Sequence, residues 1–229
     1  MDYEITNIDE NTWILSEGFV RFFLLAGKER ALLIDTGMNV GRAKEAAEAL
    51  VQVPVQLINT HADPDHTGGN KAFNQVMMHD DEKQNYQVQA EQEIIPVADG
   101  QIIELGERPV QIVWIPGHTP GSIGILDINK RYFFSGDTVQ QNSEIFMFGL
   151  MRNLERFAQS LEKLNGMSSK FDLIFPCHGA VPIKPEIIPQ MIEGTKKVLA
   201  GEISKTPKQM MFGANVNACD IGCDVLLVE

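Results

Sequence analysis

The sequence has few cysteines, no long apolar run and no excess of positive charge, and each shortage argues against a class of protein. Three cysteines in 229 residues are too few, and odd in number, for a disulfide framework, so reduced thiols are expected. No run approaches the roughly 18 apolar residues of a membrane span, and the first residues form neither a basic nor an apolar signal region. We therefore expect a cytoplasmic protein.

Positive charge is also scarce, because the formal net charge is −12. A field of this sign repels both a nucleic-acid backbone and an anionic membrane surface, so neither is expected as a partner. Hydrophobic residues make up 44% of the chain, which is enough for a core, and no linker rich in proline, glycine or serine divides it. We expect a single domain spanning residues 1–229; its oligomeric state stays open, and a homodimer is one option.

Short apolar stretches bounded by polar turns predict strands and helices in two similar halves. The first half has expected strands at 13–15, 19–25, 31–34, 55–58 and 76–78, and helices at 41–50, 66–74 and 81–93. The second has expected strands at 102–105, 110–115, 122–126, 132–134 and 173–175, helices at 154–165 and 185–199, and closing apolar runs at 210–212 and 225–228. Two sheets packed face to face with helices outside would bury both apolar faces, so we predict an α+β fold of the αββα sandwich type with two pseudo-symmetric halves.

The stretch 60–66, THADPDH, concentrates polar residues directly after a predicted strand. Imidazole nitrogen and carboxylate oxygen suit zinc, iron and manganese, and alternation in an extended segment directs His61 and Asp63 the same way. Asp65 and His66 follow a proline, where the chain must turn, so they can face a second point nearby. One loop could therefore supply ligands to two metal ions. The alternative is that His61 caps a strand and the aspartates are ordinary turn residues.

Three further polar residues, His118, Asp137 and His178, each follow an apolar strand. Any one of them alone is typical of an ordinary loop. Together with the first cluster they place four of the five histidines at strand ends, where a site is rigid and still open to substrate. The fifth, His79, precedes the acidic run 80–82, and we interpret it as part of a solvated loop end outside the site.

The triplet Asp35-Thr36-Gly37 follows the strand predicted at 31–34. An aspartic protease would need two such carboxylates sharing a proton, and the helix that follows suits a different layout. We expect Asp35 instead to orient a neighbouring loop or a metal-bound histidine.

Taken together, these motifs resemble the metallo-β-lactamase fold superfamily, especially its glyoxalase II-like hydrolase branch. The family pattern is H-x-H-x-D-H, then separate His, Asp and His residues on loops after strands, with an early Asp-Thr-Gly. The match covers nearly the whole chain in the right order, but Asp63 stands where the family has its second histidine. The resemblance implies a first metal held by His61, Asp63 and His118, a second held by Asp65, His66 and His178, and Asp137 as the bridge.

The resemblance further implies a hydrolase that acts on a small-molecule substrate with two divalent metal ions. Zinc is the metal that we expect most, and the added carboxylate of Asp63 makes iron or manganese an alternative. A bridging hydroxide oriented by Asp65, the expected catalytic residue, would attack the substrate; esters, thioesters, lactones, amides and phosphodiesters all stay open. The added carboxylate also predicts a more neutral site with weaker attraction for anionic substrates. Cys177 is interpreted as a small buried thiol.

Two other functions remain open. Flavodiiron proteins resemble the same pattern with a glutamate at the position of Asp63, and their di-iron pair reduces oxygen or nitric oxide, although no flavin domain follows within this sequence. The other possibility is a non-catalytic metal-binding module. For the wall of the site, the apolar segments 19–23 and 142–148 are equally consistent with a substrate groove and with core packing.

Overall fold

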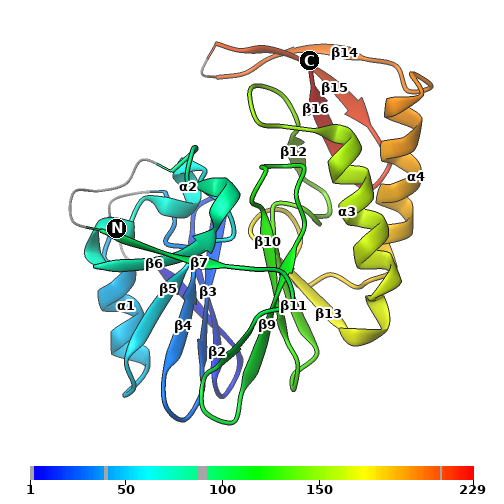
Figure 1. Ribbon diagram of the computed structural model, residues 1–229. Helices are drawn as coiled ribbons and strands as arrows, with labels where there is room; N and C mark the ends of the chain where they lie inside the picture. Colours follow the sequence, from blue (N-terminus) through cyan, green and yellow to red (C-terminus); the bar gives the residue numbers. More distant parts are fainter. Residues whose placement is uncertain (1–2, 39–40, 87–91, 212) are drawn as a thin grey trace.

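Two sheets face each other at the centre of the molecule, as the computed structural model shows for residues 3–38, 41–86, 92–211 and 213–229 (Figure 1). The first sheet has seven strands, in order β1 (Glu4–Asp9), β2 (Thr12–Glu17), β3 (Val20–Ala26), β4 (Ala31–Ile34), β5 (Val55–Ile58), β6 (Gln75–His79) and β7 (Glu93–Val97). Strands β1 to β4 pair antiparallel, and β4 to β7 pair in parallel.

The second central sheet has five strands in the order β13-β11-β10-β9-β8. They are β8 (Ile102–Glu104), β9 (Pro109–Trp114), β10 (Ile123–Asp127), β11 (Tyr132–Gly136) and β13 (Leu173–Pro176). A third, smaller sheet has the order β12-β16-β15-β14. Its strands are β12 (Glu144–Phe146), β14 (Thr206–Gln209), β15 (Asn215–Asp220) and β16 (Val225–Val228).

Helices cover the outer faces of both central sheets (Figure 1). They are α1 (Ala43–Leu50), which lies on the first sheet, the single-turn α2 (Pro64–Thr67), and α3 (Leu154–Gly166) and α4 (Ile187–Leu199), which lie on the second. Short 3-10 turns occur at Asn70–Ala72, Asp80–Glu82 and Ser168–Lys170. The predicted αββα sandwich is confirmed, and none of the helices in the described ranges is both long and apolar enough to cross a membrane.

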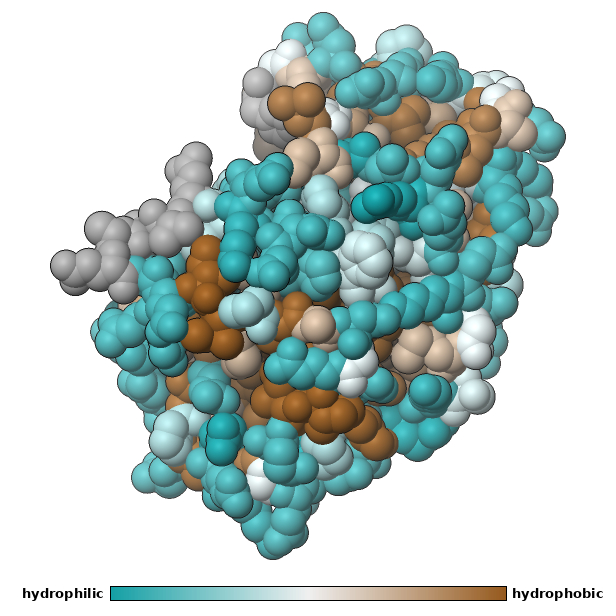
Figure 2. All heavy atoms as spheres, viewed as in Figure 1, coloured by the Kyte–Doolittle hydropathy of each residue, from teal (hydrophilic) through white to brown (hydrophobic). Residues whose placement is uncertain are grey.

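The two faces of strand β3 show why the sheets are covered on both sides. Phe23 and Leu25 point into the core between the two central sheets, whereas Phe22 and Leu24 point into the core under α1. Adjacent side chains of a strand face opposite ways, so a strand that is apolar at every position needs a layer on each face. Figure 2 shows the result: hydrophilic side chains cover most of this face, and apolar ones show through near the central strands.

The helix predicted at 81–93 is wrong where the structure describes it. The chain forms only the 3-10 turn Asp80–Glu82, residues 87–91 lie outside the described residues, and Glu93 begins strand β7. The glutamine- and glutamate-rich composition favours a helix by intrinsic propensity, but Glu93, at the end of the predicted helix, pairs with Gln75 and starts a strand that extends the sheet. At this end of the segment, tertiary pairing overrides the local preference.

The apolar segment 142–148 is also more ordered than a loop. Its centre forms β12, which pairs in parallel with β16. Strands β1, β14 and β15 are further elements that apolar patterning does not indicate, because their side chains are largely exposed or polar.

Candidate metal centre

The predicted site residues all follow the carboxyl ends of strands at one edge of the sandwich. Asp35 follows β4, His61 follows β5, and the two strands are parallel. In the second sheet, Asp137 follows β11 and His178 follows its parallel neighbour β13. Strand β9, which precedes His118, runs the same way as β11 because both are antiparallel to β10. Within each sheet, strand direction therefore brings these loops to one edge.

A first group of side chains surrounds the Asp63 carboxylate. Asp63 Oδ2 lies 3.6 Å from His61 Nε2 and 3.3 Å from His118 Nε2. Asp137 Oδ2 lies 3.9 Å and 3.6 Å from the same two nitrogens. Two imidazoles and two carboxylates thus converge on one point.

A second group shares Asp137 with the first. Asp65 Oδ2 lies 3.7 Å from His66 Nε2 and 3.2 Å from His178 Nε2. Asp137 Oδ1 lies 3.4 Å from His66 Nε2, and Asp137 Oδ2 lies 3.4 Å from His178 Nε2. Asp137 is therefore central to both groups, and the structure brings together all seven residues that the sequence indicated.

Several atoms at this centre are buried without a hydrogen-bond partner in the described structure. They are the Nε2 atoms of His61, His66 and His118 and Oδ1 of Asp137, which lie together, and in addition Nδ1 of His118 on the other side of its ring. Each buried polar atom left unpaired costs about 1–3 kcal/mol, so four of them at one point need a shared partner. Imidazole nitrogen and carboxylate oxygen fit divalent cations, and two of the residue groups able to hold an ion are His61, His118, Asp137 and Asp65, His66, His178.

The charges of the centre are strongly coupled. Burial raises the pKa of Asp137, but the neighbouring His178 and His66 outweigh burial and hold it well below its usual range. Burial lowers the pKa of His178, but Asp137 more than offsets this and raises it to about 10. Burial lowers the pKa of His118, which favours the neutral imidazole. Protons and divalent cations are alternative ways to neutralise these carboxylates, so metal binding is expected to release protons.

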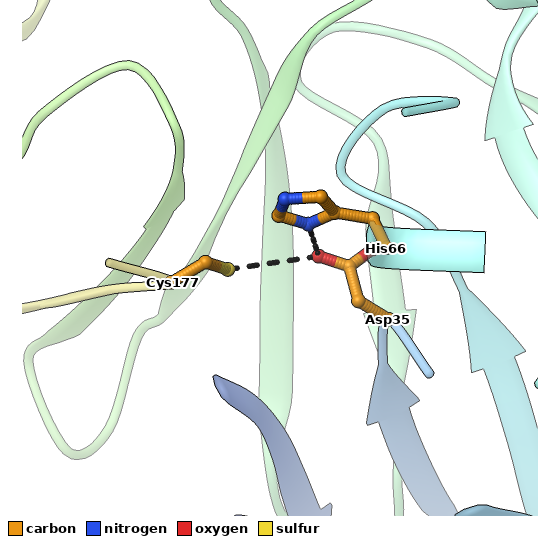
Figure 3. A group of neighbouring side chains, drawn as sticks. All are labelled: Asp35, His66 and Cys177. Atoms are coloured by element: carbon orange, nitrogen blue, oxygen red, sulfur yellow. Dashed lines mark hydrogen bonds and ion pairs between the residues drawn. The ribbon is translucent and has the colours of Figure 1, made fainter. Parts of the chain in front are cut away.

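Asp35 fixes the orientation of His66, as the sequence predicted. His66 Nδ1 lies 2.8 Å from Asp35 Oδ2 and donates there, which directs Nε2 toward the centre as the atom that would bind a metal ion. Figure 3 shows the same Asp35 oxygen accepting from the Cys177 thiol at 3.7 Å. These three residues form another group with metal-ligand types, but the Asp35 oxygen and His66 Nδ1 already bond to each other. We interpret the group as support.

Two more histidines are oriented in the same way. The Thr60 hydroxyl donates to Asp35 Oδ2 at 2.7 Å, so it accepts from His61 Nδ1 at 3.0 Å. His178 Nδ1 donates to the backbone oxygen of Phe19 at 3.0 Å. In each case the bond at Nδ1 leaves Nε2 free to face the carboxylates.

Glu82 is a supporting residue that sequence reasoning missed. Its side chain is fully buried, and its two oxygens accept from the backbone N–H groups of Ala62, at 2.9 Å, and Gly121, at 2.8 Å. It thus joins the loop of His61 to the loop of His118. The acidic run 80–82 pointed to a solvated loop end, which is wrong for Glu82; the residue is buried because the loops fold over it.

Arg152 is the second residue that the sequence did not indicate. It lies on the loop between β12 and α3, and its Nη2 donates to Asp63 Oδ2 at 2.5 Å. An arginine 89 positions away in the chain gives no local signal of this contact.

The rim of the centre is partly apolar. Phe19 is 62% exposed and stacks on His178 with 5.9 Å between ring centroids, and Leu150, two residues before Arg152, is 93% exposed. In contrast, Phe22 and Phe23 of the first predicted wall segment are core residues, as are Ile145 and Met147 of the second. His79 lies apart from the centre, stacked on Trp114 with 5.2 Å between centroids.

Residues 15–178 match the model of the metallo-beta-lactamase superfamily, and the chain belongs to this family. Among curated relatives, the human acyl-coenzyme A thioesterase MBLAC2 is 27% identical over 165 residues, which cover 54% of this chain and 59% of that protein. The hydroxyacylglutathione hydrolase of Gloeobacter violaceus is 26% identical over 137 residues, covering 56% of this chain and 54% of that enzyme. The chain spans a little over half the length of these relatives.

Solved structures show the same fold. A metallo-beta-lactamase from Pontibacter korlensis superimposes with a TM-score of 0.72 at 18% identity, over 85% of this chain and 99% of that one. A metallo-beta-lactamase from Hirschia baltica gives a TM-score of 0.69, also at 18% identity, over 85% of this chain and 98% of that one.

Proposed function

We propose that the protein is a metal-dependent hydrolase that cleaves small thioesters at a dinuclear centre. The observation that carries the proposal is the convergence of four imidazole Nε2 atoms on Asp137, with the carboxylates of Asp63 and Asp65 on either side. The first ion would be held by His61, Asp63 and His118, the second by Asp65, His66 and His178, and Asp137 would serve both. Zinc suits this donor set, with iron or manganese as alternatives.

Two divalent ions held there would polarise a carbonyl oxygen and bring the pKa of a water molecule to about 7. The chain's own part is to orient and deprotonate that water. Asp65 is partly exposed, with 19% of its side chain accessible, so a carboxylate oxygen can accept a hydrogen bond from water at the mouth of the centre. Asp137 is buried, and Asp35, Thr60 and the Phe19 backbone fix His66, His61 and His178, so that the geometry of the site stays the same from one substrate to another.

A protein nucleophile is not needed in this scheme. Cys177 lies beside the centre, but it is fully buried, and burial raises the pKa of its thiol to about 12. A thiol that stays protonated at neutral pH is a poor nucleophile. Direct attack by water is therefore the route that the site supports.

The choice of thioesters rests on two observations. The relatives named above are an acyl-coenzyme A thioesterase and a hydroxyacylglutathione hydrolase, both of which act on acyl groups bound through sulfur. The exposed Phe19, which stacks on His178, offers apolar surface next to the centre for an acyl chain. Water attack at the carbonyl carbon would break the carbon–sulfur bond and release a carboxylate and a free thiol.

The test is a substrate panel on protein reconstituted with two metal ions per chain. Acyl-coenzyme A and acylglutathione thioesters of increasing chain length would be followed by the free thiol that they release, beside an oxygen ester, a lactone and a phosphodiester. We expect thioester turnover that stops on chelation and returns with metal. Turnover of another class without thioester cleavage would overturn the substrate assignment, and no turnover despite full metal occupancy would favour a binding module.

A di-iron redox centre is the second candidate, because Asp63 adds a carboxylate to the first group. Iron would then be the metal retained on purification, and the chemically reduced protein would consume oxygen. Retention of zinc without oxygen uptake would exclude this candidate.

A further inference from the structure

Arg152 shares a single carboxylate oxygen with the metal-facing histidines. Asp63 Oδ2 accepts from Arg152 Nη2 at 2.5 Å and lies 3.3 Å from His118 Nε2. The arginine side chain is only 13% exposed, and its Nε atom is buried without a hydrogen-bond partner among the described residues. The guanidinium therefore lies inside the site and is held chiefly by Asp63.

The backbone fixes this position. Asn153 N donates to Gly117 O at 2.8 Å, which ties the residue after Arg152 to the residue before His118. The Asn153 side chain then caps α3 by accepting from Arg156 N at 2.8 Å. A Cβ atom at Gly117 would lie 2.3 Å from a backbone nitrogen of α3, so the His118 loop and the start of the helix are in close contact. Arg152 is thus placed by the same contact that places His118.

The charge of the pair explains how a carboxylate can replace a histidine here. A neutral imidazole at this position adds no charge, whereas Asp63 alone adds one negative charge. The guanidinium cancels that charge, and removal of either partner would leave the other one partly buried and unpaired. The prediction of weaker attraction for anionic substrates considered the charge of Asp63 alone. The guanidinium of Arg152, which reaches Asp63 from another loop, offsets that charge, so the reason for the prediction no longer holds.

We propose that Arg152 is a positioning residue that cancels the charge of Asp63, so that the pair substitutes for a neutral histidine at the first metal position. The inference rests on the proposed metal centre. It implies that the affinity of the first position for a divalent cation depends on the net charge of the pair. Removal of the guanidinium leaves Asp63 fully negative and strengthens cation binding, whereas removal of the carboxylate leaves an unpaired cation and weakens it.

The experiment measures Zn²⁺ affinity by competition with a chromophoric chelator, without any substrate. Arg152→Gln keeps hydrogen-bond donors but loses the charge, and it should tighten the affected position by about tenfold or more, given the Coulomb energy of charges a few ångströms apart. Asp63→His should weaken it by a similar factor, and the double variant Asp63→His/Arg152→Gln should return close to wild type. Arg152→Lys should also stay close to wild type because it keeps the charge.

Arg156→Gln is the matched control, because it removes the same charge from an exposed position in the first turn of α3. Thermal unfolding of each apo and Zn²⁺-loaded variant provides a second readout, and the metal-induced rise in Tm should be larger for Arg152→Gln than for wild type. An unchanged affinity in Arg152→Gln, or Arg152→Lys behaving like Arg152→Gln, overturns the inference. Failure of the wild-type protein to bind Zn²⁺ would instead count against the proposed centre itself.

Discussion

Individual side chains outside the ligand set decide whether the ligands can act together. His66, His61 and His178 each use Nδ1 to bond a fixed oxygen, which leaves Nε2 for the centre. The ligand types were visible in the sequence because each follows an apolar strand. Glu82 and Arg152 were not, because each acts on a loop 20 to 89 positions away in the chain, and local patterning carries no such information.

Replacement of Asp35 by asparagine should weaken metal binding. Asparagine removes the charge that favours the Nδ1-protonated form of His66, and it can turn an N–H group toward that ring. Loss of such a partner typically lowers metal affinity or activity by about 10- to 100-fold. Competition titration with Zn²⁺ measures the change. Asp172→Asn, at an exposed aspartate paired with Arg131, is the control, and equal affinities in the two variants would contradict the role of Asp35.

Replacement of Glu82 by glutamine should destabilise the protein. Glutamine has one acceptor oxygen, so its amide group must face one of the two backbone N–H groups that Glu82 now satisfies. A buried donor left without an acceptor costs about 1–3 kcal/mol, which urea unfolding can resolve. Glu93→Gln, at an exposed glutamate, should leave the free energy of unfolding almost unchanged. A Glu82 variant as stable as this control would show that the two hydrogen bonds of Glu82 contribute little to the free energy of unfolding.

Among the elements, β12 joins the segment that follows Asp137 to the small sheet formed by the last strands of the chain. This strand was hard to predict from sequence because its pairing with β16, and not an alternating pattern in the segment 144–146, makes it a strand. The same limit applies at the end of the helix wrongly predicted at 81–93, where pairing with β6 makes Glu93 part of a strand. Strands that carry their own apolar pattern, such as β3 and β4, were predicted within one or two residues.

The turn between β15 and β16 carries a titratable group that should make stability pH-dependent. Burial raises the pKa of Asp224 to about 7, although its hydrogen bond from Ser143 N lowers it. Because this folded-state pKa lies above the unfolded value of 3.8, the folded protein binds the extra proton, and stability is lost as pH rises toward 7.

Asp224→Asn removes this pH dependence while keeping an acceptor for Ser143 N. We expect the variant to be more stable than wild type by about 2 kcal/mol at pH 8, and by less than half of that at pH 5. Chemical unfolding of both proteins at the two pH values measures the difference. A variant less stable than wild type at pH 8 would mean that the charged carboxylate is not penalised there.

For the whole molecule, the sandwich was predictable because most strands of the two central sheets, and the helices that cover them, follow from apolar patterning. The centre collects three carboxylates and four imidazoles where the two central sheets meet. Divalent cations bound there would hold the two halves together.

Chelation should therefore lower the thermal stability of the metal-loaded protein. A ligand at a hundred times its Kd stabilises the folded state by about 2.7 kcal/mol, which corresponds to a Tm change of about 5–10 °C for a chain of this size. Differential scanning calorimetry before and after a chelator, and again after added Zn²⁺, would record the loss and its reversal. A Tm that does not respond to either step would argue against cations at this centre.

The two hydrogen bonds through which Glu82 joins the loops of His61 and His118 also restrict the motion of these loops. Ala62 belongs to a loop of the first sheet and Gly121 to a loop of the second, yet their amides bond to the two oxygens of one buried carboxylate. Neither loop can swing outward without releasing a charged group from its partners. The two amides lie outside the regular ladders of either sheet, but hydrogen exchange should find both of them slow, and exchanging at matched rates, as parts of one cooperative opening unit.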